Sequence, residues 1–153
     1  MLYKNKFEQT VYDSVIKNIV DKKYTFQIND SFDYYLLNRK LLCNPDELWL
    51  FKNTPKRYGT NTNSEMVLVG KGLDMRIDCK YQLNDGHIQV DNILGEIHRN
   101  VIDNKLYEKE MVFIVDGSGI SLKDIASIQK FLNRYKIKEV NIYTLSGFIR
   151  QMK

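Results

Sequence analysis

The feature that most constrains how this chain can fold is a run, residues 73–82, in which apolar and polar residues alternate without a break. Successive side chains of a β-strand point to opposite faces of the sheet. One face of such a strand would be apolar and would consist of Leu73, Met75, Ile77, Cys79 and Tyr81. The other face would be polar and would consist of Asp74, Arg76, Asp78, Lys80 and Gln82.

The polar face of this expected strand holds two carboxylates, two cations and an amide. Residues two apart on one face lie about 6.6 to 7 Å apart along a strand, so Asp78 and Lys80 can act on the same substrate atom. An acid, a base and a hydrogen-bonding amide are groups that metal-assisted hydrolysis uses. Exposed strand faces also carry such charges as ordinary solvated pairs, and the residues alone leave both interpretations open.

A second expected strand, residues 64–69, precedes the first and is joined to it by Gly70-Lys71-Gly72. A short turn that contains glycine between two strands predicts an antiparallel β-hairpin. A turn centred on residues 71–72 pairs Gly70 with Leu73 and, further along, Glu65 with Asp78. Directly opposite residues share a face, with Cβ atoms about 4.5 to 5.5 Å apart. Two carboxylates that close predict a divalent cation between them, Mg²⁺ with Mn²⁺ as a possible substitute.

The motif formed by Glu65, Asp78-Cys79-Lys80 and Gln82 around a short hairpin resembles that of the PD-(D/E)xK nuclease superfamily, especially its restriction-endonuclease-like members. The resemblance implies an α/β fold in which helices flank a mixed β-sheet with a central antiparallel hairpin. It also implies that Glu65 and Asp78 bind the metal. Lys80 would orient the attacking water or stabilise charge, and Gln82 would hold the water or a neighbouring backbone group. The chain departs from the motif at Ser64-Glu65, where Pro-Asp is usual.

The resemblance adds one further candidate ligand, because the family often carries an acid on its first helix that joins the site. Residues 5–21 are expected to form an amphipathic helix, since apolar residues recur every fourth position. Glu8 lies beside this apolar stripe and is a candidate third metal ligand. A solvated surface charge is the alternative for the same residue.

Two positions are predicted to contact DNA outside the catalytic motif. Lys56 and Arg57 lie in a polar, basic segment, residues 52–63, directly before the strand that carries Glu65. Lysine, arginine and amide side chains suit phosphate contacts, although an ordinary surface loop has the same composition. Arg76, on the polar face of the same strand, is the third residue expected to contact DNA.

The remaining elements complete the expected α/β order. Strands are expected over 24–28, 47–52, 111–115 and 140–143, and helices over 89–105, 121–134 and 145–152. Ser121 is the expected N-cap of its helix. The turn Asp116-Gly117-Ser118-Gly119 is weak evidence for phosphate binding, with an ordinary turn as the alternative. Glu96 is expected to be a solvated charge, with support of the site as the alternative.

Composition limits the class of protein. A length of 153 residues fits a single domain, 1–153, and 43% hydrophobic with 27% charged residues describes a soluble globular protein. No apolar stretch approaches the ~20 residues of a membrane span and no signal core follows Met1, so a cytoplasmic protein without membrane attachment is expected. Two cysteines and two histidines lack zinc-ligand spacing. The net charge of +4 permits a phosphate-bearing partner.

The predicted function is a Mg²⁺-dependent deoxyribonuclease, more specifically a DNA endonuclease. The Gln-x-x-x-Tyr spacing of RecB-like exonucleases is missing, because Gly86 stands four residues after Gln82. A Holliday-junction resolvase of the same superfamily and a catalytically silent DNA-binding module with the same fold are the alternatives. Cutting both strands with one small site usually needs two copies of the enzyme, so a homodimer is expected.

Overall fold

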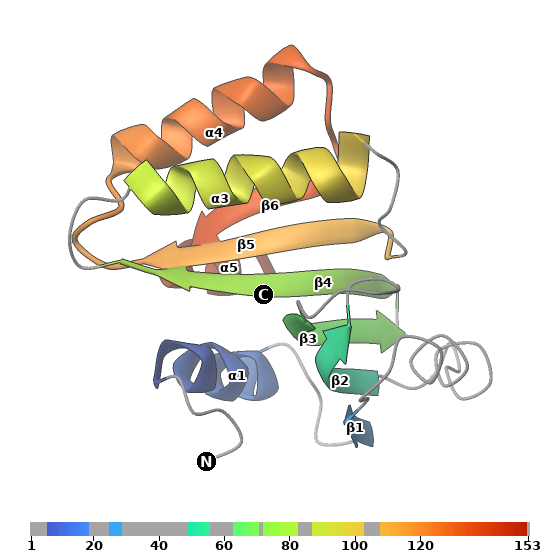
Figure 1. Cartoon of the computed structure of the whole chain (residues 1–153). Helices are drawn as coiled ribbons and strands as arrows, with labels where there is room; N and C mark the ends of the chain where they lie inside the picture. Colours follow the sequence, from blue (N-terminus) through green and yellow to red (C-terminus); the bar gives the residue numbers. More distant parts are fainter. Residues whose placement is uncertain are drawn as a thin grey trace.

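The described strands form one mixed, six-stranded sheet in the order β1-β2-β3-β4-β5-β6 (Figure 1). The computed structural model describes residues 6–18, 25–28, 49–55, 63–70, 72–82, 87–102 and 108–152. The strands are β1 (Thr25–Ile28), β2 (Trp49–Pro55), β3 (Asn63–Gly70), β4 (Leu73–Tyr81), β5 (Glu110–Asp116) and β6 (Val140–Thr144). The central strand β3 is antiparallel to both of its neighbours, whereas the other adjacent pairs are parallel.

Helices cover both faces of the sheet, as the sequence predicted for an α/β nuclease fold. They are α1 (Lys6–Asn18), α3 (His87–Ile97), α4 (Leu122–Arg134) and α5 (Leu145–Met152), and a π-helical segment, η1 (His98–Ile102), continues α3. In Figure 1, α3 and α4 lie on one side of the sheet and α1 lies on the other. None of the helices in the described ranges is long and apolar enough to cross a membrane.

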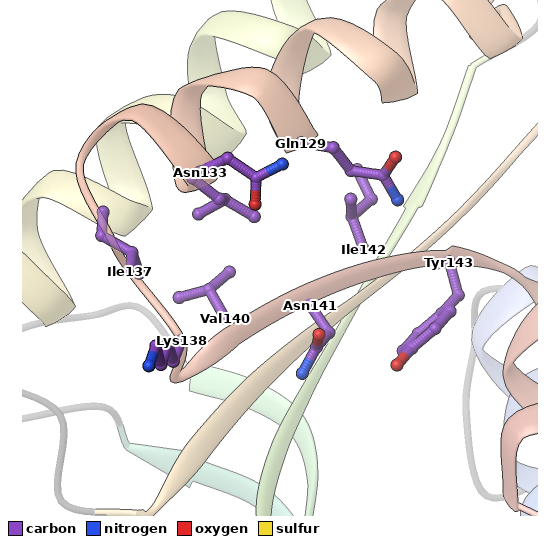
Figure 2. A pocket seen from close by; sticks show the side chains of 9 residues that line it. Gln129, Asn133, Ile137, Lys138, Val140, Asn141, Ile142 and Tyr143 are labelled. Atoms are coloured by element: carbon purple, nitrogen blue, oxygen red, sulfur yellow. The ribbon is translucent and has the colours of Figure 1, made fainter.

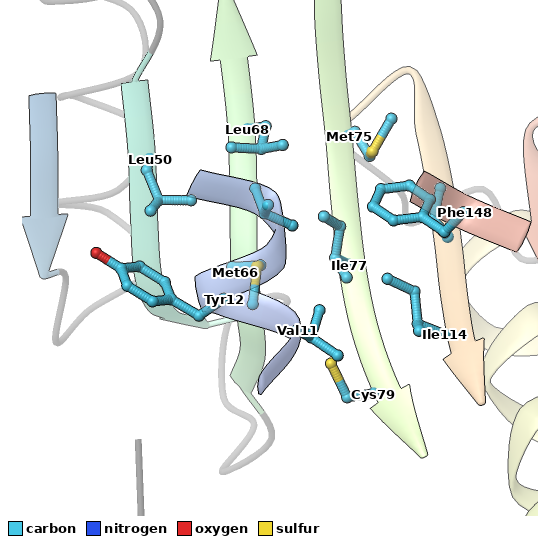
Figure 3. Packing of buried hydrophobic residues seen from close by; sticks show 12 residues of the cluster. Val11, Tyr12, Leu50, Met66, Leu68, Met75, Ile77, Cys79, Ile114 and Phe148 are labelled. Atoms are coloured by element: carbon cyan, nitrogen blue, oxygen red, sulfur yellow. The ribbon is translucent and has the colours of Figure 1, made fainter. Parts of the chain in front are cut away.

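The apolar face of β4 packs against α1 and α5. Val11 of α1 and Phe148 of α5 belong to the same buried cluster as Ile77 and Cys79 of β4, and Figure 3 shows them converging on the sheet. Cys79 is a buried free thiol, as the alternation of the strand predicted. Burial of each large apolar side chain contributes about 1.5 to 3 kcal/mol. This cluster therefore fixes which face of β4 is turned inward toward α1.

The opposite face of the sheet packs against α3 and α4. Ile93 and Ile97 of α3 and Ile128 of α4 form a second buried cluster with Phe113 and Val115 of β5. At the start of α4, the Ser121 hydroxyl accepts a hydrogen bond from the amide of Asp124 at 3.2 Å. The Asp124 carboxylate accepts from the Ser121 amide at 2.9 Å, which completes a capping box. The predicted N-cap is thereby confirmed.

The hairpin β3–β4 has the predicted register. Gly70 pairs with Leu73, and the ladder continues to the pair Met66 and Ile77. Gly72 in the turn has a φ of 81°, a left-handed conformation that glycine adopts without steric cost. One further step along each strand leads to Glu65 and Asp78. The backbone thus leaves these two positions at the same end of the hairpin.

The strand β2 differs from the sequence prediction, because it runs on to Pro55 instead of ending at residue 52. Its antiparallel pairing with β3 continues through Thr54 with Ser64 and Pro55 with Asn63, and this pairing draws polar residues into the ladder. The first part of the predicted polar loop is therefore strand. The DNA-contact predictions for Lys56 and Arg57 lie outside the described residues.

Candidate active site

The polar face of β4 is buried, which differs from an ordinary solvated strand surface. Arg76 and Asp78 are each only 1% exposed. Their side chains project from the face opposite Ile77 and Cys79, which is the face that α3 and α4 cover. The alternative of a solvated charge-pair surface therefore does not hold for these two residues.

Asp78 is the buried carboxylate at the centre of this polar face. Its Cα pairs with Phe113 of β5, so its backbone is held in the middle of the sheet. Burying a charge in a protein is costly unless opposite charges or hydrogen bonds compensate it. Arg76 and Lys80 flank Asp78 on the same face, about 6.6 to 7 Å away along the strand. The Asp78 carboxylate is therefore a buried oxygen donor with one cationic residue on either side of it along the strand.

Lys80 forms an ion pair with Glu96 of α3. The Lys80 Nζ lies 3.6 Å from Glu96 Oε2, and the two side chains are 18% and 11% exposed. Ile93 and Ile97 anchor α3 on the sheet and turn Glu96 inward toward β4. The expectation of a solvated Glu96 is therefore wrong, since helix packing carries it to the lysine. The pair orients Lys80 while leaving part of its side chain open to solvent.

Arg76 is buried within the protein, although the sequence predicted that it would contact DNA. Its guanidinium forms a buried ion pair with Glu108, and both side chains are almost fully shielded from solvent. The parallel pairing of β4 with β5 aligns Arg76 with Met111 and brings the segment before β5 alongside. A buried guanidinium held by a carboxylate is not accessible to a DNA phosphate. Arg76 is therefore not placed to contact a DNA phosphate, contrary to the prediction.

Glu65 and Gln82 are the two predicted site residues at the strand ends. Glu65 lies in β3 next to Met66, which pairs with Ile77 of β4, and its side chain is outside the described part of the structure. Gln82 directly follows β4 and is half-buried. The backbone amide of Gln82 donates a hydrogen bond to the backbone carbonyl of Asp116 at 3.1 Å. The carboxyl end of β4 is thus tied to the end of β5.

Glu8 lies in the first turn of α1 and is half-buried. The neighbouring Phe7 ring has its centroid 5.3 Å from that of Tyr81, which places this turn at the carboxyl end of β4. Lys80 is at the same end, although α1 covers the opposite face from Asp78. A role for Glu8 as a metal ligand stays a prediction.

Asp74 lies on the same face as Asp78 but belongs to a different environment. Burial raises the pKa of Glu110, and the nearby Asp74 carboxylate raises it further. Asp74 pairs with Val69 next to the hairpin turn, four residues before Asp78. Four residues of strand span about 13 to 14 Å. Asp74 therefore lies at the end of the polar face next to the hairpin turn, too far from Asp78 for the two carboxylates to share one ion.

The donor chemistry of this face fits a lightly coordinated Mg²⁺ or Mn²⁺ ion. Within the described ranges, no three His, Cys, Asp or Glu side chains gather closely enough to hold a metal ion. Mg²⁺ usually binds through one or two carboxylates and completes its coordination with water and substrate phosphate. Asp78 could supply one such carboxylate, and the backbone position of Glu65 is compatible with a second.

A separate hollow of about 370 Å³ lies between α4 and the edge strand β6. Figure 2 shows Gln129, Asn133, Lys138, Asn141 and Tyr143 around it. Its described lining contains no acid, histidine or cysteine. The strand β5 separates β6 from β4 in the sheet. This hollow is therefore not part of the polar face around Asp78.

Comparison with known proteins agrees with the arrangement around β4. A family model described as a PD-(D/E)XK nuclease superfamily domain matches residues 4–153. Searches of curated proteins and of solved structures gave no match.

Proposed function

The chain belongs to the PD-(D/E)XK nuclease superfamily, and from this membership we propose that it is a metal-dependent DNA endonuclease that hydrolyses phosphodiester bonds. A nuclease acts on nucleic acid, and the proposal specifies DNA as that substrate. The observation that carries it is the placement of buried Asp78 and Lys80 two residues apart on one strand face, where Glu96 holds the lysine. A carboxylate and an oriented ammonium group at this spacing are suited to hydrolysis of a phosphate ester.

Asp78 and Glu65 would hold Mg²⁺, and Mn²⁺ could replace it. When bound, the ion would polarise the scissile phosphate and lower the pKa of a bound water. Asp78 would serve this role because β4, an inner strand of the sheet, holds its buried carboxylate in place. Gln82 would support the water or a neighbouring backbone group from the end of β4.

Lys80 would orient the attacking water and neutralise charge that develops on the phosphate. An ammonium group has three N–H donors. Glu96 takes up one direction around Nζ at 3.6 Å, so donors remain for a water and for a phosphate oxygen. Because the ion pair restrains the flexible lysine, less conformational entropy is lost when substrate binds.

The wider DNA contacts and the oligomeric state belong to the same proposal. Lys56 and Arg57 would contact backbone phosphates beside the site. If they do, changing both residues to alanine should weaken binding and make it less dependent on salt, because fewer counterions are released. A homodimer would place two sites on one duplex. Sedimentation of the protein alone and on DNA would measure this.

The decisive experiment compares cleavage of supercoiled plasmid by wild type, Asp78→Asn and Asp74→Asn, each with Mg²⁺, Mn²⁺ or EDTA. Wild type should nick or linearise the plasmid with metal only. Asp78→Asn should lose at least about 10²-fold in rate, as expected for loss of a principal catalytic group. Asp74→Asn should change the rate only modestly, because Asp74 lies at the other end of the strand. Cleavage in EDTA, or full activity of Asp78→Asn, would contradict the proposal.

Further substrates separate the alternatives within the superfamily. Preference for a four-way junction over a duplex would identify a resolvase, and DNA binding without cleavage would identify a silent module. Glu65→Gln should abolish cleavage and weaken Mg²⁺ binding measured by calorimetry. If Asp74→Asn does so instead, Asp74 and not Glu65 supplies the first acid.

A further inference from the structure

The turn that follows β5, residues 116–119, rests directly on the end of the catalytic strand. The backbone amide of Gly119 donates a hydrogen bond to the backbone carbonyl of Gln82 at 2.8 Å. The backbone amide of Gln82 in turn donates to the backbone carbonyl of Asp116 at 3.1 Å. Gln82 is therefore held on both sides of its backbone by one short turn. The sequence leaves two interpretations of this turn open, an ordinary connection and, on weak evidence, a phosphate-binding turn.

Gly117 is required in this turn for two independent reasons. Its φ is +105°, a conformation that residues with a side chain rarely adopt. A Cβ at this position would also lie 2.8 Å from the carbonyl carbon and 2.9 Å from the amide nitrogen of Gln82. Both contacts are with backbone and cannot be relieved by rotation of a side chain. Only glycine allows the turn to approach Gln82 this closely.

The turn is also fixed at its other end. The Asp116 carboxylate accepts a hydrogen bond from the Gly117 amide at 2.8 Å. The Ile120 amide donates to the Gly117 carbonyl at 3.2 Å, and the capping box of α4 begins at the next residue, Ser121. The turn therefore connects the end of β4 to a capped helix through a continuous set of short-range hydrogen bonds.

These bonds disfavour a phosphate site in the same turn. The amides of Gly117 and Gly119 already donate to Asp116 and to Gln82. A phosphate would need such amides to point at it, and the Asp116 carboxylate would repel its charge. Gly117 instead allows the close contact of this turn with the Gln82 backbone.

We propose that the turn Asp116–Gly119 is a positioning element of the nuclease site, in which Gly117 fixes Gln82. The inference rests on the proposed function, because it assumes that Gln82 supports the reacting groups. Gly117 does not touch substrate and acts through the Gln82 backbone. Small displacements of a catalytic constellation cost rate more than they cost binding. Loss of the turn should therefore lower the chemical rate and leave DNA affinity nearly unchanged.

The chain offers a matched control for this test in Gly72. Gly72 also has a positive φ, +81°, but a Cβ there would meet nothing within 4 Å. Gly72→Ala thus introduces backbone strain without the clash that Gly117→Ala adds. Single-turnover cleavage of a duplex at saturating protein with Mg²⁺ should fall about 10- to 100-fold for Gly117→Ala. Gly72→Ala should retain nearly the wild-type rate, and both variants should bind DNA alike in EDTA.

A second measurement does not depend on activity. Amide hydrogen exchange, followed by NMR, should show faster exchange at Gln82 and Gly119 in Gly117→Ala but not in Gly72→Ala. If wild type does not cleave DNA, the proposed function fails, and this exchange pattern alone still decides whether Gly117 fixes Gln82. Protected amides in Gly117→Ala would overturn the positioning role, as would a rate equal to that of Gly72→Ala.

The route through Gln82 is tested by combining variants. In a Gln82→Ala background, Gly117→Ala should cost little further rate, because the side chain that it positions is already gone. An undiminished loss in that background would overturn the role assigned to Gln82.

A second variant tests the turn if Gly117→Ala does not fold. Asp116→Ala can replace Gly117→Ala, because the Asp116 side chain is exposed and its carboxylate accepts the hydrogen bond of the Gly117 amide. Asp116→Ala should then slow cleavage about 3- to 10-fold, and an unchanged rate would overturn the proposal.

Discussion

Two ion pairs on the same face of β4 differ in how deeply they are buried and in the role that we infer for each. Arg76 pairs with Glu108 where the two side chains are 1% and 0% exposed. Lys80 pairs with Glu96 four residues later, where the two side chains are 18% and 11% exposed. One strand therefore carries a sealed pair at its middle and a partly open pair near its carboxyl end.

The chemistry of the two cations matches these environments. A guanidinium is planar, weakly hydrated and always charged, which suits a permanent buried pair with a carboxylate. An ammonium on a flexible stem is a compact charge that can turn between a protein carboxylate and a substrate. We infer that the Arg76 pair serves stability and that the Lys80 pair serves the reaction. The following variants test this division.

The largest effect is expected for Lys80→Ala. Cleavage should fall about 10²- to 10⁴-fold, since the variant removes the group that orients water and offsets charge. DNA affinity in EDTA should stay close to wild type. Cleavage within a few-fold of wild type would remove Lys80 from the mechanism. The double variant Lys80→Ala with Glu96→Gln restores charge balance and should stay inactive, which excludes a purely structural explanation.

The sealed pair should show its effect in stability. Glu108→Gln leaves the Arg76 charge buried without its carboxylate partner and should cost about 3 to 5 kcal/mol of unfolding free energy. Urea unfolding measures this. Replacing both residues with apolar ones, as in Arg76→Met with Glu108→Leu, should recover most of the loss, because no buried charge remains. If Glu108→Gln is as stable as wild type, the pair does not support the fold.

A smaller effect is expected for Glu96→Gln. The lysine keeps its position on β4 but loses the charge that restrains it, so the cleavage rate should fall on the order of 10-fold, as for loss of a supporting group at a metal site. Asp91→Asn is the matched control, because Asp91 is exposed on the same helix α3. Equal rates for the two variants would show that Glu96 does not act on Lys80.

The smallest effect concerns Glu110, the first residue of β5, which lies opposite Met75 near the end of β4 that adjoins the hairpin turn. Burial and the Asp74 charge raise its pKa, so the folded state holds its proton more tightly than the unfolded state does. Stability should therefore decline as the pH rises from the ordinary pKa of a glutamate to the raised one. Glu110→Gln should remove this decline, with a gain below about 0.5 kcal/mol at neutral pH. Thermal unfolding between pH 4 and 7 measures it, and an unchanged pH profile would contradict it.

Local pattern was sufficient to predict the elements that build the site. Alternation over residues 73–82 predicted β4 and the face of each of its side chains. The glycines around Lys71 predicted the hairpin, whose register follows from counting outward from the turn. The Ser121 cap and the amphipathic helices were likewise predictable, because capping and periodicity depend on neighbours within a few residues.

The partners of the polar side chains were not predictable in this way. Arg76 and Lys80 look equivalent in the strand pattern, yet one is sealed against Glu108 and the other is half-open beside Glu96. The difference arises because the chain crosses over through α3 between the parallel strands β4 and β5. This crossover brings Glu96 next to Lys80, 16 residues earlier in the sequence, and Glu108 next to Arg76, 32 residues earlier. The contact of Gly117 with Gln82 has the same origin, since β5 lies beside β4.

Sequence therefore specified which groups are available for chemistry and on which face of β4 they stand. Packing of α3 and β5 on that face determined which charges are buried, which are paired and which remain open to a substrate. The physical reason is that strand alternation is a property of neighbouring residues, whereas burial and ion pairing are properties of surfaces that meet only after the chain has folded.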